Sequence, residues 1–62
     1  MYYIQYTYFS GMTPTSQTAK ARTRKMAMES ANNISKWTEV PSTVEVVYKG
    51  KTVARFQKGK KL

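Results

Sequence analysis

The stretch TVEVVYKGKTVARF, residues 43–56, contains two runs of mostly β-branched and aromatic residues on either side of one glycine. This composition predicts a β-hairpin. A two-residue loop at Lys49 and Gly50 would mix charged and apolar side chains on each face. A three-residue loop, residues 48–50 with Gly50 left-handed in a bulge, separates them better and is the one we favour. It predicts one face formed by Val44, Val46, Thr52, Ala54 and Phe56, and an opposite face formed by Glu45, Val47, Lys51, Val53 and Arg55.

A further strand is predicted at the amino terminus, where residues 2–9 are nearly all aromatic or β-branched. Gly11 and Pro14 follow and predict a loop. If one face of the strand is covered, alternation divides its side chains into two sets. The covered set is Ile4, Tyr6 and Tyr8, and the uncovered set is Tyr3, Gln5, Thr7 and Phe9.

A helix is predicted next, with Thr15 or Ser16 as its N-cap. Small and apolar side chains recur at helical spacing on one side of this segment, and charged or polar ones on the other. Tandem Asn32 and Asn33 could end the helix, or it could run on toward Trp37; both alternatives stay open. The inner face comprises Ala19, Thr23, Met26, Ala27, Ser30, Ala31, Ile34 and Trp37, and the outer face Arg22, Lys25, Glu29, Asn32 and Lys36.

These elements predict an α+β domain over residues 1–57. Its architecture is β-α-β-β: a small three-stranded antiparallel sheet with one helix packed on one face. We place the third strand in the middle of the sheet. Residues 58–62, with two lysines after a glycine, are predicted to form a flexible basic tail.

The composition argues against catalysis and metal binding. The 62 residues include no Cys, His or Asp, and the acids are Glu29, Glu39 and Glu45, which are scattered along the chain. We therefore expect no enzyme activity, no catalytic residues, no metal and no cofactor. No apolar run approaches the roughly 20 residues needed to span a bilayer, which predicts no membrane partner and a cytoplasmic location.

Charge is the strongest functional signal in the sequence. Eleven Lys and Arg against three Glu give a formal net charge of +8. The stretch TAKARTRKMAM, residues 18–28, carries several cations and no acid. On the predicted helix these cations diverge around the exposed side, an arrangement that suits phosphates on either side of a groove. The alternative is that they form an ordinary solvated helix face.

Two functions are compatible with these features. The first is a small basic nucleic-acid-binding protein of low sequence specificity, for DNA or RNA. The second is a small accessory or inhibitor protein, of the kind that viruses and mobile elements often encode, which binds an acidic surface of a partner protein. The uncovered aromatic face could also be buried in a homodimer. The candidate phosphate-binding residues are Lys20, Arg22, Arg24, Lys25, Lys51, Arg55 and Lys58, and the candidate stacking residues are Tyr3 and Phe9.

Overall fold

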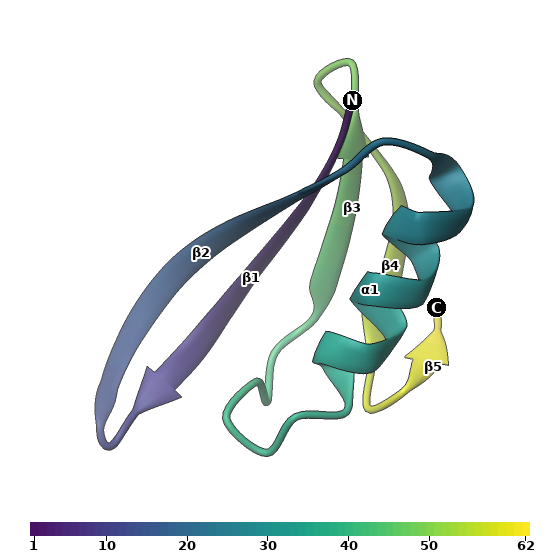
Figure 1. Ribbon diagram of the computed structural model, residues 1–62. Coiled ribbons are helices and arrows are strands. Elements are labelled where there is room, and N and C mark those ends of the chain that lie inside the picture. Colours follow the sequence, from purple (N-terminus) through teal and green to yellow (C-terminus); the bar gives the residue numbers. More distant parts are fainter.

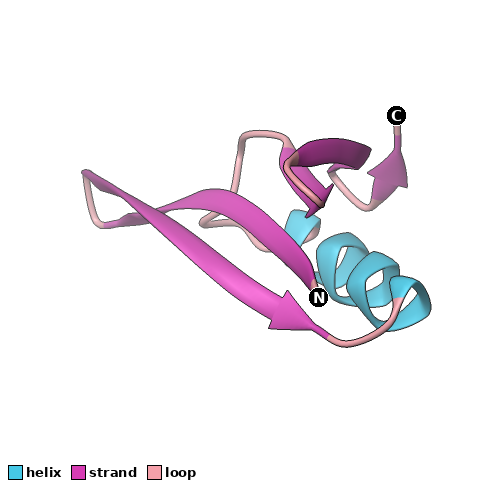
Figure 2. Ribbon diagram, turned by 90° about the horizontal axis from the view of Figure 1, so that it is seen from above, coloured by secondary structure: helices cyan, strands magenta, loops and turns pink.

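The computed structural model describes residues 1–62, which form one antiparallel sheet of five strands and one helix (Figure 1). The elements in chain order are β1 (Tyr2–Ser10), β2 (Thr13–Ala21), α1 (Arg24–Ser35), β3 (Val44–Tyr48), β4 (Lys51–Gln57) and β5 (Lys60–Lys61). The strand order is β2-β1-β3-β4-β5, and every neighbouring pair is antiparallel. The helix lies against one face of the sheet (Figure 2). The fold is α+β, but the predicted three-stranded β-α-β-β sheet is wrong because it lacks β2 and β5.

Residues 13–21, which we assigned to a loop and the start of the helix, form the strand β2. Ser10 pairs with Thr13, so the β1–β2 hairpin has the two-residue loop Gly11–Met12. Gly11 has a φ of 67° and Met12 has no positive φ, as in hairpin loops that need glycine only at their first position. Pro14 is tolerated because β2 is an edge strand of the sheet.

The helix is consequently shorter than predicted and begins after Thr23. The Thr23 Oγ1 atom accepts a hydrogen bond of 3.2 Å from the Met26 backbone N–H, which caps the first turn. The helix ends at Ser35, between the two ends that the sequence left open. The predicted inner face is confirmed for Ala27, Ala31 and Ile34, which are buried.

Two large side chains that we placed on the inner face are half-exposed instead. Met26 is 52% exposed because the buried row of the helix runs through Ala27 and Ala31 at i, i+4 spacing. Trp37 is 48% exposed and lies beyond the last helical residue. The close contact between α1 and the sheet is therefore made mainly by small side chains and Ile34.

The β3–β4 hairpin has a two-residue loop, so the predicted three-residue loop is wrong. Lys49 and Gly50 both adopt left-handed angles, with φ values of 51° and 78°. The register shifts between Val46 and Val47, where Val53 is the extra residue on β4. Because of this bulge, Ala54 and Phe56 lie on the same face as Val44 and Val46, which is the arrangement that the three-residue loop predicted. Val44, Val46, Ala54 and Phe56 are buried as predicted, whereas Thr52 is exposed.

The third predicted strand, the second strand of the hairpin, corresponds to β4, and its predicted middle position is also wrong. The strand beside β1 is β3, and β4 follows it. In this order Ile4 on β1 is directly opposite Val46 on β3, and both are fully buried. The hydrophobic core gathers on the helix side of the sheet. Its members are Ile4, Ala21, Ala27, Ala31, Ile34, Val40, Val44, Val46, Ala54 and Phe56.

The carboxyl-terminal residues have specific partners in the structure. After a turn at Lys58 and Gly59, β5 pairs with the end of β4. The Gly59 backbone N–H donates to the buried Ser35 Oγ at 2.9 Å, and the Asn32 side-chain amide donates to the Gly59 carbonyl at 3.0 Å. The mobility predicted for residues 58–62 stays a prediction, to which the structure adds these contacts with the end of α1.

The single helix, α1, has twelve residues. It is neither long enough nor apolar enough to cross a membrane.

Candidate nucleic-acid interface

Two segments that are far apart in the sequence, residues 20–25 and 49–51, bring basic side chains to one end of the sheet, which we call the cationic end. The amino terminus, the β2–α1 connection and the β3–β4 turn all lie at this end (Figure 1). The register confirms their proximity, because Tyr2 is opposite both Ala21 and Tyr48, and Tyr48 is opposite Lys51. All basic side chains of the cationic end are exposed; they are Lys20, Arg22, Arg24, Lys25, Lys49 and Lys51.

No acid neutralises the cationic end. The first turn of α1 contains no acidic residue and begins with Arg24 and Lys25. Cations at a helix N-terminus oppose the helix dipole, so this placement costs some stability. Arg55 is the only basic residue that forms an ion pair, through a 3.1 Å contact between its Nε and Glu45 Oε2 on the neighbouring strand. The cationic end therefore offers a concentration of unpaired positive charge.

Aromatic rings accompany these charges. Tyr2 and Tyr48 stack with their ring centroids 4.3 Å apart and their planes at 19°. Lys49 Nζ lies 5.3 Å from the centroid of the Tyr48 ring, within cation–π range. Tyr3 is opposite Lys20 on the other face of the sheet and is 37% exposed. Rings beside cations are the combination on which bases stack while phosphates are neutralised.

The structure separates the remaining candidate residues from the cationic end. Arg55 is held by Glu45, and Lys58 lies in the β4–β5 turn beside the carboxyl-terminal end of α1. Phe9 shares a sheet face with Tyr3 but lies six residues further along β1, about 20 Å away at the usual rise of a strand. Tyr3 and Phe9 therefore do not form one stacking site, and the predicted residue set divides between different regions.

Two residues of the cationic end were missing from the predicted set. Lys49 and Tyr48 were both placed in the loop of the predicted hairpin, and neither was among the candidate binding residues. Both residues lie close to Lys51 in the sequence, which is the signal that could have identified them. Their proximity to Arg22 and Arg24 depends on the strand order. Placing β3 beside β1 would have identified both.

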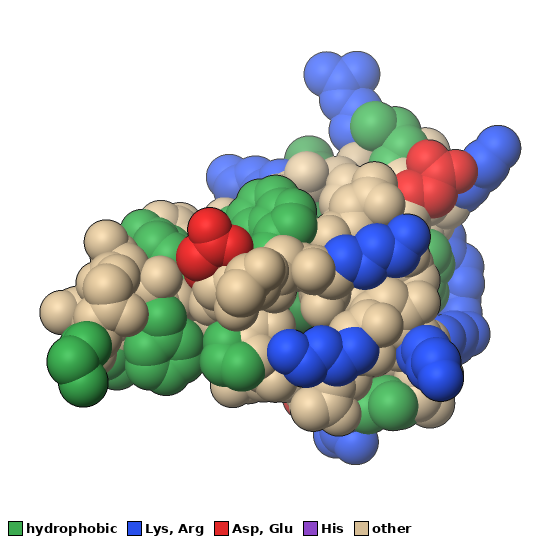
Figure 3. Space-filling model, turned by 90° about the horizontal axis from the view of Figure 1, so that it is seen from below, with side chains coloured by type: hydrophobic (Ala, Val, Ile, Leu, Met, Phe, Trp, Pro, Cys, Tyr) green, Lys and Arg blue, Asp and Glu red, His purple; other side chains and the backbone are tan.

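The β1–β2 hairpin contrasts with the cationic end. No charged side chain occurs between Tyr2 and Ala19, which include β1 and most of β2. Figure 3 shows that the projecting end of the molecule carries hydrophobic and polar side chains, while Lys and Arg gather over the remainder. The β1–β2 hairpin is therefore uncharged up to the residues that enter the cationic end.

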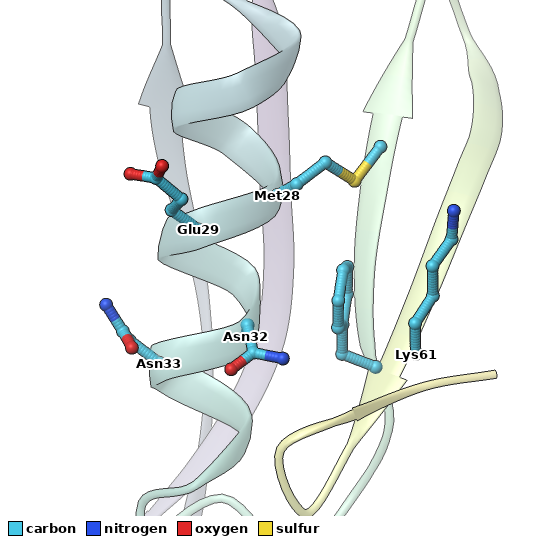
Figure 4. Close-up of a pocket in the computed structure, with 6 residues that line it drawn as sticks. Met28, Glu29, Asn32, Asn33 and Lys61 are labelled. Atoms are coloured by element: carbon cyan, nitrogen blue, oxygen red, sulfur yellow. The ribbon is translucent and has the colours of Figure 1, made fainter.

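Four hollows lie outside the cationic end, and two of them lie on the helix side of the sheet. An open groove between α1 and the carboxyl-terminal strands is lined by Met28, Glu29, Asn32, Asn33, Phe56 and Lys61 (Figure 4). A second cleft, which we call the aromatic cleft, lies on the helix side of the β1–β2 hairpin. There Tyr6 and Trp37 meet edge to face, with ring centroids 6.1 Å apart. The aromatic cleft is lined by Tyr6, Tyr8, Gln17, Trp37 and Glu39.

Neither of these two hollows contains a group of side chains that could hold a metal ion, since no three acidic side chains lie close together.

Comparison of the chain with protein-family models, curated proteins and solved structures finds no match.

Proposed function

We propose that the protein is a nucleic-acid-binding module of low sequence specificity that contacts phosphates through the cationic end. One observation carries this proposal: basic side chains from two segments that are far apart in the sequence lie at one end of the sheet, and no acid there pairs with them. In a domain of this size such a concentration of like charge lowers stability. A phosphate backbone would relieve the repulsion by neutralising the charges.

The elements of the cationic end suggest a division of roles. Lys and Arg side chains contact phosphates, which positions the protein without reading sequence. The backbone N–H groups at the start of α1 point toward the same end and favour a further anionic oxygen. Tyr3, exposed beside Lys20, is placed to stack on an unpaired base. Contacts to phosphates and to the face of a base do not read sequence, so low specificity is expected.

Salt dependence is the first test of this proposal. Fluorescence anisotropy of labelled duplex DNA, single-stranded DNA and RNA would be measured against the protein at several salt concentrations. We expect log K to fall linearly with log salt, with a slope of about −4 on duplex DNA if four to five phosphates are contacted. Micromolar or tighter binding should persist near physiological salt. Absence of binding to all three forms there would overturn the proposal.

The aromatic cleft favours a second candidate, an accessory or inhibitor protein that binds a partner protein with an acidic surface. Trp37 and Tyr6 are of the residue types that dominate binding energy at protein interfaces, and Trp37 is half-exposed. The cleft lies away from the cationic end, where it would not contact a nucleic acid bound there. The same titrations distinguish the two functions, because this candidate predicts no binding of any nucleic acid that persists near physiological salt.

A further inference from the structure

The two edges of the sheet differ in length and charge. At one edge, β5 has two residues, and both are lysines. Short length and exposed lysines are the usual protection of an edge against pairing with another chain. At the other edge, β2 has nine residues and a single charged one, Lys20, near its end. One edge is therefore protected, and the other is long and nearly uncharged.

The register of the hairpin shows which backbone groups of β2 are free. Ser10 and Thr13 flank the two-residue loop, and in such hairpins the flanking pair exchanges both of its hydrogen bonds. Bonded and non-bonded pairs alternate from there along an antiparallel ladder. The odd-numbered residues of β2 therefore bond to β1. The backbone groups of the even-numbered residues point outward; these residues are Pro14, Ser16, Thr18 and Lys20.

Pro14 occupies one of these outward positions. Its missing N–H would have faced away from β1, so the hairpin loses no hydrogen bond. The three outward N–H groups of the free edge belong to Ser16, Thr18 and Lys20, and Pro14 contributes only a carbonyl. The edge thus lacks one donor at the hairpin end and has all of its outward donors from Ser16 to Lys20.

We propose that β2 pairs antiparallel with β2 of a second copy of the chain, about a two-fold axis at Gln17. In this register Ser16 of each copy is opposite Thr18 of the other, and they exchange both hydrogen bonds. Lys20 of each copy is opposite Pro14 of the other, where the lysine N–H meets the free proline carbonyl. Every outward N–H of β2 then has an acceptor on the other copy. The donor that Pro14 lacks leaves no N–H unpaired. The contact is isologous and joins the two sheets into one.

Charge does not oppose a second copy at this edge, although each copy carries a net charge of +8. Residues 2–19 contain no charged side chain, so the two copies approach through their least repulsive region. With the axis at Gln17, the two Lys20 residues lie about 20 Å apart along the strands, beyond the screening length of about 8 Å in physiological salt. The cationic ends point in opposite directions and remain free. The interface needs no nucleic acid, so this inference does not depend on the proposed function.

Substitution of Thr18 by Pro tests the pairing selectively. Proline there removes an outward N–H that β1 does not use, so the hairpin should persist while the edge is blocked. Sedimentation equilibrium would be measured up to about 1 mM protein, because interfaces of this size associate weakly. We expect the wild-type chain to show a monomer–dimer equilibrium and T18P to stay monomeric. In the wild type, amide exchange at Ser16 and Thr18 should slow as the protein concentration rises.

A second variant protects the test against misfolding of T18P. Thr18→Lys keeps every backbone donor and places two new cations about 7 Å apart across the axis, within the screening length. It should weaken the dimer at least tenfold, whereas Thr52→Lys, the same change at an exposed position on β4, should not. A wild-type chain that is monomeric at all concentrations would overturn the inference. So would a dimer that forms equally well in T18P and T18K.

Discussion

Simultaneous replacement of Arg22, Arg24 and Lys25 by Ala is expected to weaken nucleic-acid binding by between two and three orders of magnitude at about 0.1 M salt. Each phosphate contact contributes about 0.9 to the slope of log K against log salt on duplex DNA, so the slope should become less negative by about 2.7. All three residues belong to the cationic end, and none forms an ion pair. Anisotropy titrations of the wild type and the variant over the same salt range would measure both quantities.

A matched control is available at the opposite end of the sheet. Replacing Lys58, Lys60 and Lys61 by Ala removes the same net charge from the β4–β5 turn and β5. We expect a much smaller loss of affinity, because these lysines lie outside the cationic end. Equal losses in the two variants would show that only total charge matters and would contradict a localised interface.

Protein stability provides an independent check on the same variant. Arg24 and Lys25 oppose the dipole of α1 at its first turn, and Ala is a better helix former there. The free energy of unfolding of the triple variant should therefore be unchanged or slightly higher. A loss of binding without a loss of stability would mean that binding, not folding, accounts for these cations.

Replacement of Ile4 by Ala is expected to remove about 3 kcal/mol of stability, the largest effect of any single substitution considered. Ile4 is fully buried on β1, between β2 and β3, and belongs to the core beneath α1. A domain of this size has a total stability of only about 3 to 9 kcal/mol, so the substitution removes a third of it or more and should lower the urea midpoint substantially. Urea denaturation followed by circular dichroism would measure the change.

Met12→Ala is the control for this substitution. Met12 lies in the β1–β2 loop and is 96% exposed, so its truncation should leave the urea midpoint unchanged. An Ile4→Ala midpoint close to that of the wild type would mean that β1 does not pack in the core as the structure shows.

Local alternation explains which parts of the fold were predictable. The faces of β1 and of the β3–β4 hairpin follow from a period of two, and burial of Ile4, Val44, Val46, Ala54 and Phe56 agrees with it. The small inner face of α1 follows similarly from its period. These patterns depend only on neighbours in the sequence.

The strand β2 was missed because its residues have no decisive local preference. Thr, Ser, Gln, Ala and Lys occur in both strands and helices, and Ala19 and Thr23 happened to extend the helical spacing of α1 backward. Gly11–Met12 lacks the Asn-Gly or Asp-Gly signature of a short hairpin. Residues 13–21 form a strand because they pair with the strongly β-forming residues of β1, and this pairing is a tertiary effect.

The candidate site was predictable in composition but not in arrangement. The positive charge of residues 20–25 can be read directly from the sequence. Their proximity to Lys49 and Lys51 can be predicted only when the strand order β1-β3-β4 is known. Arg55 differs from the other cations because it forms an ion pair, and predicting that pair requires the register that places Arg55 opposite Glu45. Strand order and register arise from contacts distant in sequence, which a single sequence does not reveal.

Amide chemical-shift mapping tests the central claim most directly. A short duplex and a single-stranded oligonucleotide would each be titrated into isotope-labelled protein at about 0.15 M salt, where generic charge attraction is largely screened. We predict that the largest shifts occur at Lys20 to Lys25 and at Tyr48 to Lys51, with small shifts at the hairpin loop and at Lys58. Shifts of similar size across all basic residues, or shifts centred on the aromatic cleft, would contradict binding at the cationic end.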